Sequence, residues 1–254
     1  MSNLLILIYF TLTVIISVVT LTLSIGVTEK RYTPVKELSL DLLEDDGKDV
    51  KVWECFNLAY FLIIIGLTMI LTVSIGNLAL TGVFTRNLQL SFLSIPLFTH
   101  LLLGSLICCY TDTKYAAISN YFTYGGITIG ILCNITLILT GTLMDDVVNV
   151  GALNLISGLV CFLAITVLQF LLRNKIGGGD LKFIVMVTFA LPIVVIPYFL
   201  LIACSIMIVS FIVRDIIIYI KTKKKPENRP LQFGIPLTIS LWIHIIGYIY
   251  YIFV

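Results

Sequence analysis

The sequence predicts an all-α, polytopic membrane bundle of about eight transmembrane helices, because it is strongly hydrophobic, poor in charge and built from long apolar runs. Of its 254 residues, 59% are hydrophobic and 12% are charged, and the mean hydropathy is +1.09. Ordinary globular chains carry about 25% charged residues, so a soluble domain of this length could not bury so much apolar surface. The runs are continuous and about 20 residues long, whereas a membrane β-barrel would alternate in segments of about 10 residues.

The predicted spans are separated by short polar or proline-containing breaks. The break between the sixth and seventh spans depends on Pro192 and Pro197, which interrupt a run that is too long for one crossing. We divide the chain into an N-terminal part, 1–91, which contains a polar loop at 28–54, and a membrane core, 92–254. The spans cover residues 4–27, 55–83, 92–111, 122–141, 151–172, 181–195, 197–220 and 234–254.

Lysine and arginine residues indicate the orientation. They concentrate in the connections after the first, third, fifth and seventh spans, which share one side if every span crosses the bilayer. The loops of the other side contain only Arg86, together with Asp145 and Asp146. The positive-inside rule therefore puts the basic connections in the cytoplasm and both termini outside the cell membrane. Because the basic residues lie beside apolar runs, we expect the lipid bilayer and no nucleic acid as a partner.

Two aspartates are the candidate catalytic residues, since charges at membrane depth are costly and usually mark function or a paired contact. Asp112 follows the third span, and Asp180 precedes the sixth. The predicted topology puts both at the cytoplasmic level, so they can meet although they lie far apart in the sequence. Two carboxylates in a partly dry place cannot both ionise. One can then activate a water molecule as a base, while the other, protonated, polarises a peptide carbonyl.

The glycine run before Asp180, residues 177–179, allows two interpretations. Without Cβ atoms the glycines would let an extended substrate backbone approach the acid. They could equally form a flexible turn, with Asp180 as the N-cap of the helix that follows.

Other polar residues in the spans have simpler explanations. Asp215 follows Arg214, and a local ion pair is the favoured interpretation. His100 and His244 lack metal-ligand spacing, so helix–helix hydrogen bonds are expected for both, with no metal and no cofactor. The six cysteines form no Cys-x-x-Cys pair, and packing is the favoured role for each.

Three separated segments resemble the prepilin-peptidase family, which includes the archaeal preflagellin peptidases. Residues 112–120, Asp-Thr-Lys-Tyr-Ala-Ala-Ile-Ser-Asn, resemble the family's first-aspartate segment, in which a basic residue and then Ile-Pro-Asn follow the acid. Residues 177–182, Gly-Gly-Gly-Asp-Leu-Lys, are similar to the Gly-x-Gly-Asp-x-Lys signature. Residues 232–236, Gln-Phe-Gly-Ile-Pro, resemble the Pro-Phe-Gly-Pro segment that opens the last helix. Ser119 replaces the usual proline of the first segment, and in the last segment Ile235 stands where the family has proline, which moves to Pro236.

The resemblance implies an aspartyl endopeptidase that removes the short basic leader of pilin-like or flagellin-like precursors at the cytoplasmic membrane face. It assigns catalysis to Asp112 and Asp180. The four-cysteine segment of the bifunctional bacterial members is missing between the first two spans, so we expect proteolysis without N-methyltransferase activity. Substrate binding or support of the site is expected from residues near the acids in the three segments, namely Gly177, Gly178, Gly179, Lys182, Lys114, Phe233, Gly234 and Pro236.

Two alternatives remain open from the sequence. Presenilin-like intramembrane proteases share Gly-x-Gly-Asp, but they have Tyr-Asp at the first acid and a later Pro-Ala-Leu, whereas Thr111 separates Tyr110 from Asp112 here. A transporter could use the two acids to carry protons or ions.

Overall fold

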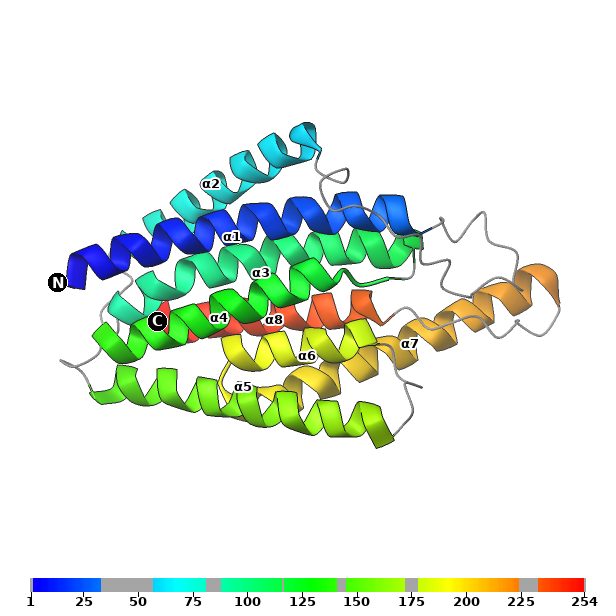
Figure 1. The fold of residues 1–254 in the computed structure, drawn as a ribbon. Helices are drawn as coiled ribbons and strands as arrows, with labels where there is room; N and C mark the ends of the chain where they lie inside the picture. Colours follow the sequence, from blue (N-terminus) through cyan, green and yellow to red (C-terminus); the bar gives the residue numbers. More distant parts are fainter. Residues whose placement is uncertain are drawn as a thin grey trace.

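The computed structural model describes residues 2–32, 57–80, 88–115, 117–140, 145–171, 178–223 and 233–253. Helices are the only regular secondary structure in this part of the chain, which confirms the all-α prediction (Figure 1). Each predicted span has a corresponding helix. In chain order the elements are α1 (Ser2–Arg31), α2 (Leu58–Leu80), α3 (Leu88–Tyr115), α4 (Asn120–Thr140), α5 (Asp145–Leu171), α6 (Gly178–Ala190), the 3₁₀ turn η2 (Ile193–Val195), α7 (Ile196–Thr222) and α8 (Gly234–Phe253).

The predicted break between the sixth and seventh spans is confirmed. Helix α6 ends at Ala190, and Pro192, which has no N–H to continue the helix, precedes η2. Pro197 lies in the first turn of α7, where a missing N–H costs nothing. At the other end of the chain, α1 continues to Arg31, so residues 28–31 of the predicted polar loop are helical. The loop's residues 33–54 lie outside the described residues.

Five helical segments of the described chain are long and apolar enough to cross a membrane: Leu4–Arg31, Leu93–Tyr115, Asn120–Thr140, Val150–Leu171 and Ile193–Ile217. Helices α2 and α8 contribute shorter apolar segments there, Leu58–Val73 and Gly234–Gly247. Helix α6 has 13 residues. At about 1.5 Å per residue that is about 20 Å, less than the hydrocarbon thickness of about 30 Å. The chain thus has the helices of a multi-pass membrane protein, and eight crossings remain a prediction.

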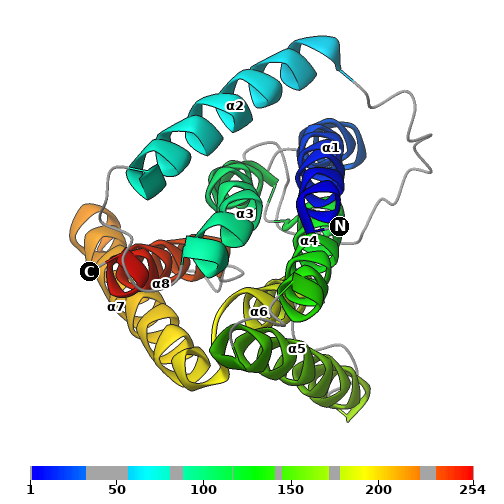
Figure 2. The same cartoon turned by 90° about the vertical axis from the view of Figure 1, so that its left-hand side faces the viewer.

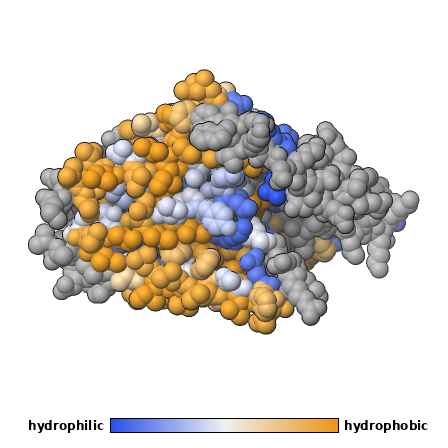
Figure 3. All heavy atoms as spheres, viewed as in Figure 1, coloured by the Kyte–Doolittle hydropathy of each residue, from blue (hydrophilic) through white to orange (hydrophobic). Residues whose placement is uncertain are grey.

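The molecular surface fits a bilayer protein. In the view of Figure 3 the described surface is largely apolar, and hydrophilic residues gather toward one end of the bundle. This end, which we call the polar end, is where α1 and α3 finish and where α4, α6 and α8 begin (Figure 1). Both chain termini lie at the opposite end.

Helix α4 is the centre of the bundle, packing against α1, α3, α5 and α6, while α8 packs against α3 and α7, and α2 lies outside against α1 and α3 (Figure 2). Close approach of α4 and α6 requires glycine, since a methyl group at Gly130 would lie 2.9 Å from Phe189 Cβ. Buried Asn134 donates its amide N–H to the Phe189 carbonyl, 2.8 Å away. These contacts fix α6, and with it Asp180, against the centre of the fold.

Candidate functional site: two aspartates at the polar end

Asp112 lies in the last turn of α3, buried with 4% exposure, and faces the start of α8. Its Oδ2 accepts a hydrogen bond of 3.0 Å from the backbone N–H of Gly234. Gly234 is the first residue of α8, where N–H groups have no partner within the helix and the helix dipole favours negative charge. The carboxylate of one helix therefore caps another. A methyl group at Gly234 would lie 2.8 Å from Asp112 Oδ2, so glycine permits this contact.

Asp180 lies in the first turn of α6 and is partly buried. Burial and, to a smaller extent, the negative charge of Asp112 together raise the pKa of Asp180 to about 6. The two aspartates that the sequence predicts to meet are therefore close enough to interact electrostatically. The buried Cys108, one turn before Asp112, interacts with the charges of both acids.

The segment around Asp180 also contacts the segment that follows Asp112 at two further points. A methyl group at Gly179 would lie 2.9 Å from Ile118 Cβ, so this glycine allows α6 to pack on the chain just before α4. Lys182 Nζ donates to Asn120 Oδ1 at 2.8 Å and lies 5.1 Å from the centre of the Tyr124 ring. Asn120 is the last residue of the first segment. Lys182 thus binds a neutral side chain of α4.

The remaining predicted residues are spread around this centre. Phe233 is partly buried and packs against the hydrophobic core, and Pro236 is buried in the first turn of α8. Gly178 is in contact with Gln169 of α5, since a methyl group there would lie 3.4 Å from its Nε2. Gly177 lies outside the described residues. A role for any of these residues toward a substrate stays a prediction.

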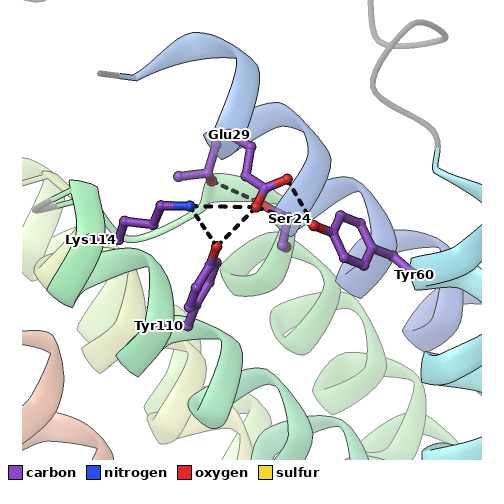
Figure 4. A network of polar contacts seen from close by, with 6 residues as sticks. Ser24, Glu29, Tyr60, Tyr110 and Lys114 are labelled. Atoms are coloured by element: carbon purple, nitrogen blue, oxygen red, sulfur yellow. Dashed lines mark hydrogen bonds and ion pairs between the residues drawn. The ribbon is translucent and has the colours of Figure 1, made fainter. Parts of the chain in front are cut away.

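Lys114 lies at the same end but belongs to a different group of side chains (Figure 4). Its ammonium donates to Tyr110 Oη at 2.9 Å and lies 3.9 Å from Glu29 Oε1. Tyr110 and Lys114 are one helical turn apart on α3, so successive residues 100° apart put Asp112 on the opposite face. No sequence signal marks Glu29 beyond its place just after the first predicted span.

The histidines and Asp215 make the kinds of contact that the sequence predicts, with one correction. His100 Nδ1 lies 3.0 Å from Ser17 Oγ and Nε2 lies 3.2 Å from the Phe122 carbonyl, so it joins three helices. For His244 the prediction of a helix–helix hydrogen bond is wrong: Nδ1 lies 2.8 Å from the Ser240 carbonyl one turn earlier in α8. Asp215 pairs with Arg214 at 3.0 Å, which confirms the local ion pair.

Cysteines and metal ligands complete the description. Cys108 and Cys133 are buried, and Cys109 and Cys161 are partly buried, in agreement with a packing role. Cys204 is exposed on α7, so packing is the wrong interpretation for this residue. The described residues contain no group of three or more His, Cys, Asp or Glu side chains that could hold a metal ion.

Fold and site together define a class: a multi-pass helical membrane protein with two interacting aspartates at one end of its bundle. A sequence model of the type IV leader peptidase family matches residues 99–212, which contain both aspartates. The match confirms the prepilin-peptidase resemblance over this segment, which makes up less than half of the chain. No curated protein and no solved structure matches the chain. Gly234 lies beyond the matched residues and is linked to them by its contact with Asp112.

Proposed function

We propose that the protein is a membrane aspartyl endopeptidase that removes the basic leader of pilin-like or flagellin-like precursors at the cytoplasmic face of the cell membrane. The family supports a leader peptidase. The observation that carries the catalytic assignment is the meeting of three segments, through the Gly234–Asp112 hydrogen bond and the interaction of Asp112 with Asp180.

The two aspartates act as a dyad that shares one proton. Asp112 faces an N–H donor, which suits an ionised carboxylate, so Asp180 carries the proton. Asp112 takes a proton from a water molecule, whose oxygen attacks the scissile carbonyl carbon, while Asp180 donates a hydrogen bond to the carbonyl oxygen. When the tetrahedral intermediate collapses, the C–N bond breaks and the leaving amine takes the proton that Asp112 received. No cofactor takes part in these steps.

The chain is proposed to cleave without methylating the new N-terminus. This part of the proposal rests on the sequence, since the region between the first two spans has no cluster of cysteines. The test is incubation of the purified protein and a processed precursor with S-adenosylmethionine, followed by mass measurement. A methylated N-terminus would contradict the monofunctional assignment.

The proposed activity is tested by co-expression with a precursor that has a basic leader followed by an apolar segment of about 20 residues. We expect a smaller product on a gel, with a new N-terminus just before the apolar segment. Cleavage within that segment would instead support a presenilin-like protease. No cleavage, combined with an ion or proton flux in proteoliposomes that needs both aspartates, would support the transporter.

A further inference from the structure

A group of polar side chains joins α1, α2 and α3 at the polar end, and none of its contacts involves the two aspartates (Figure 4). Tyr110 Oη donates to Glu29 Oε1 at 2.9 Å. Tyr60 Oη lies 3.1 Å from Glu29 Oε2 and donates to the same carboxylate. Lys114 completes the group. We call these four residues the Glu29 cluster.

Within the Glu29 cluster, the carboxylate is held chiefly by neutral donors. The Lys114 ammonium is 3.9 Å from Glu29, at the limit of an ion pair, and 2.9 Å from the Tyr110 hydroxyl. It also lies 5.3 Å and 5.1 Å from the ring centres of Tyr110 and Tyr115, where the aromatic faces attract a cation. Hydroxyl donors orient Glu29 without cancelling its charge. With 25% of its side chain exposed, Glu29 remains accessible to a second cation.

Glu29 and Asp112 lie on opposite sides of the end of α3. The width of a helix with its side chains is about 10–12 Å. An extended peptide spans about 3.3–3.6 Å per residue. The straight width corresponds to about three to four residues, and a path around the end of α3 is longer, so a leader would reach Glu29 about three to five residues before the scissile bond. Asp215, the other described carboxylate near this end outside the dyad, is already paired with Arg214 at 3.0 Å.

We propose that Glu29 is a specificity-determining residue that binds a lysine or arginine side chain of the leader, about three to five residues before the scissile bond. The inference rests on the proposed peptidase function and extends it, because the family match does not identify what recognises the leader's positive charge. Tyr60 and Tyr110 orient the Glu29 carboxylate, and the incoming cation replaces Lys114 in its long contact with Glu29.

The test uses the full-length protein and precursors whose neutral leader carries one lysine or one glutamine at successive positions. We expect the wild-type protein to prefer the lysine leader, through a lower KM, when the lysine is about three to five residues before the cleavage site. Glu29→Gln should reduce this preference by about fivefold, the value of a partly exposed ion pair, and Glu29→Lys, assayed in addition with a leader that carries one glutamate, should favour that leader. Glu29→Asp should retain much of the preference. The matched control Asp215→Asn, which removes a carboxylate that is already paired, should keep it fully.

The outcomes separate this inference from the proposed function. If the wild-type protein cleaves but shows no position-dependent charge preference, the inference is wrong and the peptidase stands, even if the Glu29 variants fail to fold. An unchanged preference in Glu29→Gln and Glu29→Lys would also overturn it. If the wild-type protein cleaves neither precursor series, both the proposed peptidase function and the inference about Glu29 are wrong.

Discussion

The contact between Gly234 and Asp112 permits a sharp test, because one methyl group should displace the proposed catalytic carboxylate and leave the fold intact. In Gly234→Ala the new Cβ would lie 2.8 Å from Oδ2, 2.9 Å from Cγ and 3.0 Å from Cβ of Asp112. Carbon atoms in ordinary contact are about 3.5–4.0 Å apart, so the carboxylate must move by about 0.5–1 Å. The atoms in the way belong to the Asp112 side chain and not to the backbone, so the helices can stay in place.

The expected loss follows from the displaced carboxylate. A misplacement of about 1 Å costs about 100-fold in rate, and a hydrogen bond to a charged group contributes about 1.5–3 kcal/mol, or about 10- to 100-fold. Gly234→Ala should therefore lower the single-turnover cleavage rate by about 10- to 100-fold, with normal membrane insertion and a modest fall in thermal stability, because the same hydrogen bond caps α8. The matched control is Gly247→Ala on the same helix, where a Cβ would meet nothing within 4 Å. Wild-type cleavage by Gly234→Ala would refute the assignment of Asp112 as a positioned catalytic base.

Three further predictions concern the hydrogen bond between Lys182 and Asn120, the pH dependence of cleavage and the membrane topology. Lys182→Met should slow cleavage by about fivefold, because a hydrogen bond to Asn120 is worth about 1 kcal/mol. Asn120→Leu should match it, and the double variant should be no worse; additive losses would show that the pair does not act together. Because burial raises the pKa of Asp180 to about 6, the dyad keeps its proton at higher pH than an ordinary aspartate. We expect kcat/KM to fall as pH rises through about 6, and a fall centred near the usual value of about 4 would contradict this. Reporters fused after positions 47 and 225 should lie in the cytoplasm and one after 146 outside; opposite sides for 47 and 225 would rule out eight spans.

Much of the fold was accessible from hydrophobicity alone. The all-α class and the break at Pro192 follow from local chemistry, since apolar length selects helices and a missing N–H ends one. The continuation of α1 to Arg31 was not accessible in this way. Its last turn contains Glu29, which contacts Tyr110 of α3, 81 positions away. Tertiary contacts of this kind extend a helix into a stretch that is polar by composition.

The site was predicted in part. Spacing and predicted topology bring Asp112 and Asp180 to one level, and the interaction between them agrees with that. The resemblance points to Gly234, but the sequence cannot reveal that its N–H reaches Asp112, 122 positions away, because every residue except proline carries such a donor. Lys114 shows the opposite limitation. Its place beside Asp112 in the sequence suggested the site, but one turn of helix geometry directs it to Glu29.

The central claim is that Asp112 and Asp180 form one catalytic unit. Its most direct test is the cleavage rate of a basic-leader precursor by Asp112→Ala, Asp180→Ala and the double variant, each checked for membrane insertion and folding. Because the members of such a unit are not additive, each single variant should abolish cleavage and the double variant should be scarcely worse. Asp215→Ala, which removes a locally paired carboxylate, should cleave normally and at most lower the yield. Near wild-type cleavage by either single variant of the dyad would contradict the account.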